Sequence, residues 1–219
     1  MTTSFHPTVE ELTLADVVDR ARSLAVPGTR RILGLTGAPG AGKSTVAAHI
    51  VDALGPESAV LVPMDGFHLA NEVLLSLERR DRKGAHDTFD DDGYAHLIER
   101  IHAQRPTDAV IYAPVFRREI EEPIGSSIGI HPETPLVVTE GNYLLLDEDA
   151  WPKARAAVDA VWFLAPAEDL RHERLIRRHQ AFGKSIDDAR FWTLGSDQVN
   201  ADLIHSTARH ADRVIRIID

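Results

Sequence analysis

The sequence predicts an α/β fold in three layers, a mostly parallel sheet with helices on both faces, and two observations support this. Short apolar runs alternate with segments of helical periodicity, which is typical of parallel βαβ units with right-handed crossovers. A glycine-rich turn also lies between one such run and the helix that follows it. The chain has 219 residues, a length that suits one domain, so we expect a single domain over 1–219.

Six apolar runs are the expected strands: 31–36, 60–62, 109–113, 136–139, 160–164 and 213–218. Six segments are the expected helices: 8–24, 43–54, 70–80, 94–104, 167–180 and 186–205. The least regular stretch is 114–135, which contains four prolines and two glycines. Because long connections in compact domains are often functional, we interpret it as a candidate substrate loop.

Composition restricts the function. The formal net charge is −10, which argues against nucleic acid as the main partner. There are no cysteines, so disulfides and thiolate metal sites are excluded. Residues 1–10 do not show the pattern of a secretion signal, and no apolar stretch approaches the ~18 residues of a membrane span. We therefore expect a cytoplasmic protein that contacts neither nucleic acid nor membrane.

The glycine-rich turn matches the pattern G-x-x-x-x-G-K-[ST] between an apolar run and a helix. Glycines let the backbone approach phosphates closely, and the helix adds its positive N-terminal end. Lys43 would reach the β- and γ-phosphates of ATP, and Ser44 would ligate Mg²⁺. The alternative is a chance glycine-rich turn before a helix. The expected nucleotide-binding residues are Gly37, Ala38, Pro39, Gly40, Ala41, Gly42, Lys43, Ser44 and Thr45.

Two carboxylates follow expected strands. Ligands of open α/β sheets bind at the carboxyl ends of the strands, and Asp65 lies just beyond the run 60–62. Asp65 is the candidate base that accepts a proton from an alcohol; alternatively, it caps a helix or meets Mg²⁺ through water. Glu140 ends the run 136–139, a Walker-B-like position, and would hold Mg²⁺ with Ser44.

Arginines are concentrated in the expected helix 167–180. Arg171, Arg174 and Arg178 share one face of it, and guanidinium groups would neutralise charge during phosphoryl transfer. We interpret 171–185 as a lid with a hinge at Gly183, and Arg174 and Arg178 as catalytic. The alternative is a solvated face paired with nearby acids.

Six segments in consistent order resemble the P-loop kinases that include uridine kinase, phosphoribulokinase and type I pantothenate kinase. They are GLTGAPGAGKST (34–45), MDGFH (64–68), RKGAHDTFD (82–90), YAPVFRREIEEP (112–123), TEGNYLLL (139–146) and RLIRRHQAFGKS (174–185). The overall likeness is to small bacterial proteins labelled fructose-transport-system or nucleoside/nucleotide kinases. The resemblance implies a P-loop NTPase fold, Asp65 as the base and Glu140 near Mg²⁺. The chain is shorter than type I pantothenate kinases and does not match their pantothenate residues.

The acceptor side is less defined. Tyr112 lies just before the expected substrate loop and either lines the acceptor pocket or packs in the core. Arg117 and Arg118 either meet an anionic acceptor or pair with neighbouring glutamates. The residues expected beside the substrate are Asp65, His68, Lys83, Tyr112, Arg117 and Glu140.

We therefore expect an ATP-dependent kinase that phosphorylates a hydroxyl of a small metabolite, with a sugar, a nucleoside or a pantothenate-like alcohol as acceptor. The alternatives are an ATP-binding switch or transport-accessory ATPase without a dedicated acceptor, and a nucleoside monophosphate kinase. A homodimer is left open, because an isologous interface leaves no readable mark in a sequence.

Overall fold

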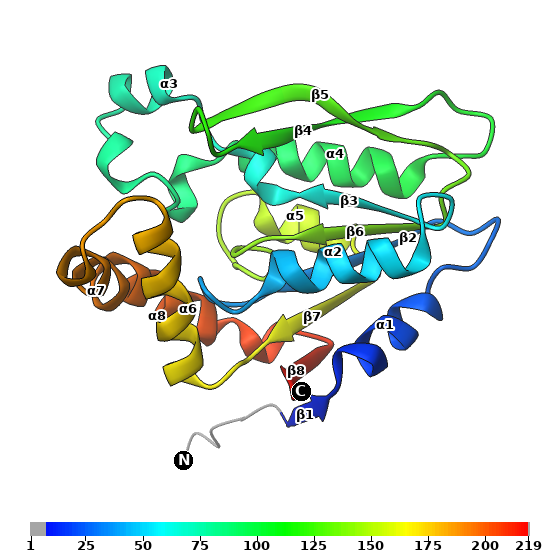
Figure 1. The fold of residues 1–219 in the computed structure, drawn as a ribbon. Helices are drawn as coiled ribbons and strands as arrows, with labels where there is room; N and C mark the ends of the chain where they lie inside the picture. Colours follow the sequence, from blue (N-terminus) through cyan, green and yellow to red (C-terminus); the bar gives the residue numbers. More distant parts are fainter. Residues whose placement is uncertain (1–7, 219) are drawn as a thin grey trace, which may run out of the picture.

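The computed structural model describes residues 8–218. In this part of the chain, six parallel strands form one sheet in the order β1-β8-β7-β2-β6-β3, with helices on both faces (Figure 1). The predicted three-layer α/β fold is therefore confirmed. The strands are β1 (Val9–Leu12), β2 (Arg31–Thr36), β3 (Ala59–Pro63), β6 (Leu136–Glu140), β7 (Ala160–Leu164) and β8 (Arg213–Ile217).

The helices differ widely in length. None in the described residues is long and apolar enough to cross a membrane. They are α1 (Leu14–Arg22), α2 (Lys43–Leu54), α3 (Asn71–Ser76), α4 (Asp91–Ala103), α5 (Trp151–Ala156), α6 (Glu168–Ala181), α7 (Ile186–Leu194) and α8 (Ser196–Ser206), with the 3₁₀ turns η1 (Met64–Phe67), η2 (Arg80–Arg82), η3 (His86–Thr88) and η4 (Ala208–His210).

The central strand β2 is apolar in its middle, from Ile32 to Leu35, because both faces of the sheet are covered. Successive strand residues point to opposite faces, so Ile32 joins the core beneath α4 and α5, whereas Leu33 and Leu35 join the core beneath α1 and α2. Burial on both sides fixes the register, since a shift by one residue would exchange the faces. The loop after β2 is therefore presented from a rigid base.

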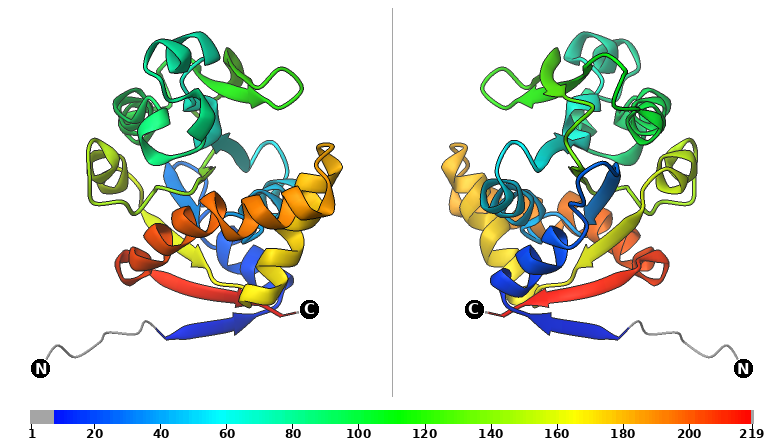
Figure 2. Two further views of the ribbon diagram at one scale, coloured as in Figure 1. Left: turned by 90° about the vertical axis from the view of Figure 1, so that its left-hand side faces the viewer. Right: turned by 90° about the vertical axis from the view of Figure 1, so that its right-hand side faces the viewer.

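A separate antiparallel hairpin corrects two predictions. The expected strand 109–113 does not join the parallel sheet, and 114–135 is not an irregular loop. Instead, β4 (Ile111–Arg117) and β5 (Glu122–Ile130) pair with each other and lie beside β3 (Figures 1 and 2). Proline is tolerated because each strand of a two-stranded ribbon has an unpaired edge, and the register shifts at Pro114.

Three of the expected helices differ clearly from the structure, and a further helix was not predicted. The expected helix 8–24 is wrong in its first turn, because β1 occupies Val9–Leu12 and Thr13 then starts α1 with a capping box to Asp16. The expected helix 70–80 is reduced to α3. The expected helix 186–205 breaks into α7 and α8 at Gly195, and α5 was not predicted.

Candidate active site

The glycine-rich loop connects β2 to α2 at the carboxyl edge of the sheet. Gly40 and Gly42 have φ of +84° and +91°, a region that favours glycine. A Cβ on Gly40 would lie 2.8 Å from the carbonyl oxygen of Arg171 and 2.8 Å from Leu175 Cγ, so α6 packs directly on the loop. Gly42 begins α2 without a side-chain cap, which leaves the first amides of the helix available to an anion.

Lys43 is buried inside this loop. Its Nζ donates hydrogen bonds to the carbonyl oxygens of Gly37 at 2.8 Å and Ala38 at 3.2 Å. Burial lowers the pKa of Lys43 from 10.5 to about 8, and the nearby carboxylates Glu140 and Asp65 partly oppose that shift. A phosphate placed on the loop would favour the charged ammonium.

Ser44 and Glu140 meet beside Lys43. Glu140 is the last residue of β6 and lies opposite Leu35 of β2 and Pro63 of β3. It is buried, and Ser44 Oγ donates to its Oε1 at 3.2 Å. Burial and, to a smaller extent, the negative charge of the nearby Asp65 carboxylate raise the pKa of Glu140 to about 7.

This pair of oxygen ligands fits Mg²⁺. A hydroxyl and a buried carboxylate are hard donors, and Mg²⁺ in phosphoryl-transfer sites is held by one or two such side chains together with phosphate oxygens and water. In residues 8–218 no cluster of three His, Cys, Asp or Glu side chains could hold a metal.

Asp65 lies in η1, two residues beyond the end of β3. Because Pro63 is opposite Glu140 in the sheet, the adjacent strands bring Asp65 and Glu140 to the same edge. Arg118 Nη2 lies 3.2 Å from Asp65 Oδ2. The next residue, Gly66, touches the hairpin so closely that a Cβ there would lie 2.5 Å from the carbonyl oxygen of Pro114.

His68 supports the segment that carries Asp65. Its Nδ1 is 2.8 Å from the backbone oxygen of Asp65, and because a carbonyl can only accept, Nδ1 carries the hydrogen. The ring lies between Phe89 and Phe116, with centroids 4.1 and 4.6 Å away. Burial lowers the pKa of His68. The expected substrate residue His68 therefore lies against the backbone of Asp65 as a packed ring whose charged form is disfavoured by burial.

Lys83 belongs to a hairpin clamp, which we define as Lys83, Asn71, Glu121 and Glu122. Lys83 Nζ donates to Asn71 Oδ1 at 2.8 Å and to the carbonyl oxygen of Glu121 at 2.5 Å. The two oxygens of the Glu122 carboxylate accept hydrogen bonds from the backbone N–H of Asn71 at 3.0 and 3.1 Å. These bonds join the start of α3 to the turn between β4 and β5.

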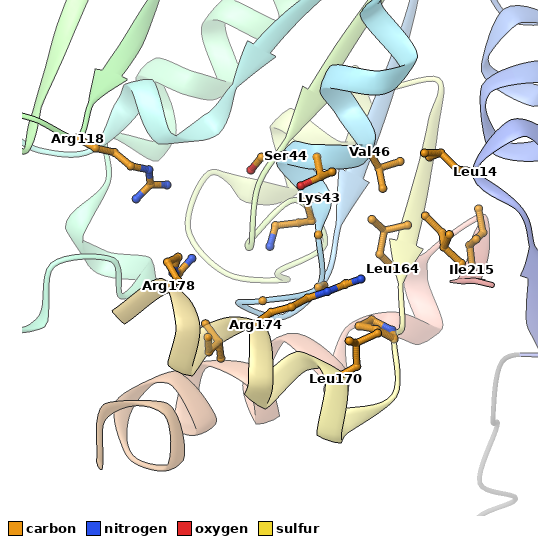
Figure 3. Close-up of a pocket in the computed structure, with 17 residues that line it drawn as sticks. Leu14, Lys43, Ser44, Val46, Arg118, Leu164, Leu170, Arg174, Arg178 and Ile215 are labelled. Carbon is orange, nitrogen blue, oxygen red and sulfur yellow. The ribbon is translucent and has the colours of Figure 1, made fainter. Parts of the chain in front are cut away.

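A pocket of about 490 Å³ lies beside the loop (Figure 3). One part is cationic, with Lys43, Arg118, Arg174 and Arg178, and no Asp or Glu lines it. The other part is apolar and comes from elements far apart in sequence. It includes Leu14, Val46, Leu164, Leu170 and Ile215. Sequence reasoning identified the loop and the arginines but missed this apolar wall.

The arginines of α6 have different roles. Arg174 and Arg178 line the pocket. Arg171 is fully buried: its Nη1 donates to the Pro39 carbonyl at 3.2 Å and its Nη2 to Gln198 Oε1 at 2.5 Å. Arg171 therefore attaches α6 and α8 to the loop.

None of the six expected substrate residues is among those that line this pocket. Tyr112 pairs with Gly129 at the far end of β4 and is 59% exposed. Arg117 pairs with Glu122 across the hairpin and does not line the pocket. Its neighbour Arg118 does line the pocket, although the residues expected beside the substrate included Arg117 and not Arg118.

A parallel sheet with a phosphate-binding loop between β2 and α2 defines the P-loop class of kinase folds. The model of the Phosphoribulokinase / Uridine kinase family matches residues 32–217. The chain belongs to that family and is an ATP-dependent small-molecule kinase.

Individual relatives agree with this assignment. A Schizosaccharomyces pombe protein named as a proposed uridine kinase is 30% identical over 211 residues, which cover 92% of this chain and 89% of the relative. A crystal structure of a proposed fructose transport system kinase from Silicibacter sp. TM1040 is 32% identical, with a TM-score of 0.79, and covers 93% of this chain and 98% of that one. Phosphoribulokinase from Rhodobacter sphaeroides shares the fold, at 14% identity and a TM-score of 0.57, over 88% of this chain and 72% of that one.

Proposed function

We propose that this kinase transfers the γ-phosphoryl group of ATP to a hydroxyl of a small metabolite (a sugar, a nucleoside or a pantothenate-like alcohol) and that Asp65 accepts the hydroxyl proton. One observation carries the proposal: Asp65 follows β3, Glu140 ends β6, and the loop with Lys43 follows β2, so all three lie at one edge of three adjacent strands. Lys43 also interacts electrostatically with both carboxylates.

The pocket supplies separate environments for the two ends of ATP. The loop amides and Lys43 would bind the β- and γ-phosphates, with Arg174 and Arg178 closing from α6. The apolar wall around Leu14, Leu170 and Ile215 would bind the adenine base of ATP, which prefers an apolar environment. Ser44 and Glu140 would hold Mg²⁺, which neutralises phosphate charge when bound.

The acceptor would enter between Asp65 and the loop. Its hydroxyl oxygen forms the new bond to the γ-phosphorus while its proton passes to Asp65, and the bond from that phosphorus to the β–γ bridging oxygen breaks to release ADP. Lys43, Arg174 and Arg178 would stabilise the charge that shifts onto the leaving phosphate.

The variant Asp65→Asn tests the proposal. It keeps the size and polarity of the side chain but cannot accept a proton, so we expect acceptor-dependent ADP formation to fall about 100- to 10,000-fold with little change in ATP affinity. Asp147→Asn, at an exposed acid without a hydrogen-bond partner among the described residues, is the matched control. Full activity of Asp65→Asn would remove Asp65 from this role.

A panel of candidate acceptors tests the reaction class. Acceptor-stimulated ADP formation, with a phosphorylated product detected by mass, is the expected result. Slow hydrolysis that no acceptor stimulates would instead support the alternative of an ATP-binding switch or transport-accessory ATPase.

A further inference from the structure

Arg118 is the cation of the pocket that comes from the acceptor side. It follows β4, whereas Lys43 belongs to the loop and Arg174 and Arg178 belong to α6. In Figure 3 its guanidinium points from the hairpin into the space that Lys43 and Arg178 face from the opposite side. The side chain is half-exposed, and its guanidinium donates a hydrogen bond to the Asp65 carboxylate at 3.2 Å.

The phosphate side of the pocket does not need this fourth cation. Lys43 and Arg174 lie directly at the loop, since a Cβ on Gly42 would lie 3.2 Å from Arg174 Nη1. Arg178 adds a third positive charge from α6. Arg118 approaches from across the pocket and contacts the Asp65 carboxylate rather than the glycine-rich loop.

The hairpin clamp holds the turn that follows Arg118. Glu121 has φ of +54°, unusual for a residue other than glycine, and its carbonyl oxygen accepts from both Lys83 Nζ and Asn71 Nδ2. Arg118 is therefore presented from an element that is fastened to the α3 side of the molecule, independently of α6.

The ion pair occupies an oxygen of the carboxylate that an acceptor hydroxyl must reach. Asp65 can bind the hydroxyl freely if Arg118 moves to another anion. We propose that this anion is part of the acceptor: Arg118 forms a subsite for a carboxylate or phosphate group carried near the reacting hydroxyl. When such an acceptor binds, Arg118 exchanges its ion pair with Asp65 for an ion pair with the acceptor, and Asp65 is released. A neutral alcohol leaves the guanidinium paired with the Asp65 carboxylate.

The inference rests on the proposed kinase function and narrows it to small anionic alcohols. Carboxylates and phosphates both accept paired hydrogen bonds from a guanidinium, so hydroxy acids and sugar phosphates share the required chemistry. The overall charge of −10 disfavours anions elsewhere on the molecule, whereas Arg118 and the other cations that line the pocket attract them.

The test compares alcohols that differ mainly in their anionic group: glycerate with glycerol, pantothenate with panthenol, and fructose 6-phosphate with fructose. Uridine is added as a neutral nucleoside. Phosphorylated products are quantified by mass at saturating ATP. We expect kcat/KM to be at least about tenfold higher for the anionic member of the accepted pair, and the accepted pair tells a carboxylate from a phosphate.

The variant Arg118→Gln assigns the effect to this side chain. It should raise KM for the anionic acceptor about 10- to 100-fold, leave KM for ATP within about twofold, and reduce the preference over the neutral partner. Arg118→Lys should restore part of the loss. Arg100→Gln, which removes an exposed arginine of α4, is the matched control and should behave as wild type.

The outcomes separate this inference from the proposed function. If neutral alcohols or uridine are phosphorylated as well as or better than anionic ones, the kinase function stands and the subsite is overturned. Equal weakening of ATP and acceptor binding by Arg118→Gln would likewise assign Arg118 to the nucleotide. If wild type phosphorylates none of the compounds and binds none by calorimetry with a non-hydrolysable ATP analogue, both proposals fail.

Discussion

Gly40 sets the shape of the phosphate loop at the scale of a single residue. Replacement by alanine would place a methyl group against Arg171 and Leu175 at a positive φ. We expect Gly40→Ala to lower the free energy of unfolding by about 3 kcal/mol and to weaken ATP binding strongly. Urea unfolding and nucleotide titration measure the two effects.

Gly28 offers the matched control. It also has a positive φ, of +79°, but a Cβ there would meet nothing within 4 Å. Gly28→Ala should therefore cost only about 1 kcal/mol, for the backbone conformation, with unchanged ATP affinity. Equal costs at the two glycines would show that contact with α6 is unimportant to the loop.

The depressed pKa of Lys43 predicts a pH-dependent stability without nucleotide. Because burial lowers this pKa from 10.5 to about 8, the unfolded chain holds more protons between those values, and stability rises with pH there. The cost of burying the charge is fully present below pH 8 and is gone above pH 10.5.

We therefore expect wild type to gain about 2 kcal/mol relative to Lys43→Met between pH 7.5 and 9.5, measured by urea unfolding of both proteins. A constant difference over this range would contradict the buried, charge-destabilised state of Lys43.

The sequence identified the loop residues because their chemistry depends on a local spacing of glycines, lysine and serine. Its substrate list included Arg117 and not Arg118, because the end of β4 at Arg117, after which Arg118 enters the turn, is set by pairing with β5 and not by a local pattern. The apolar wall was also hidden, since Leu14 and Ile215 come together only after the chain has folded.

At the scale of elements, the hairpin clamp should control the acceptor side alone. Lys83→Met keeps the length of the side chain but removes the donor to Asn71 and Glu121. We expect faster hydrogen exchange around 117–122 and a roughly tenfold lower kcat/KM for the acceptor, since each lost charge-assisted bond costs about 1.5–3 kcal/mol. ATP affinity should not change.

Lys153→Met provides the comparison for that variant. Lys153 forms an exposed ion pair with Asp92 at 2.9 Å, and such pairs contribute less than about 1 kcal/mol. It should leave exchange at 117–122 and acceptor kinetics unaltered. If Lys83→Met weakens ATP binding as much as acceptor turnover, the clamp does not act on the acceptor side alone.

The elements that sequence patterns located well are those with local signals. The central strands are continuous apolar runs, and α6 has clear helical periodicity. By contrast, β1 is defined by pairing of Val9 with Val214, a partner about 200 residues away, and the hairpin is defined by pairing across prolines. Such contacts leave no periodic mark in the segment itself.

At the scale of the whole molecule, charge is distributed unevenly. The chain carries a net charge of −10, yet the pocket beside the loop is lined by four cations and no acids among the described residues. Salt screens such attraction, so we expect the dissociation constant for ATP to rise several-fold between 50 and 500 mM KCl. Isothermal titration in both salts measures it.

Arg174→Gln should flatten this salt dependence, because it removes one of the attracting charges from the pocket, while Arg100→Gln should preserve it. Nucleotide affinity that is independent of salt in wild type would contradict the electrostatic account of the pocket.

Gly66 lies at the contact between the segment of Asp65 and the hairpin. Because Gly66 has no side chain, the backbone beside Asp65 packs against the Pro114 carbonyl. Asp65 and the hairpin are therefore in direct contact and would shift together. Changes at the hairpin turn could then alter which alcohol is accepted while the phosphate loop, built on a different part of the sheet, stays as it is. One scaffold could thereby serve relatives with different acceptors.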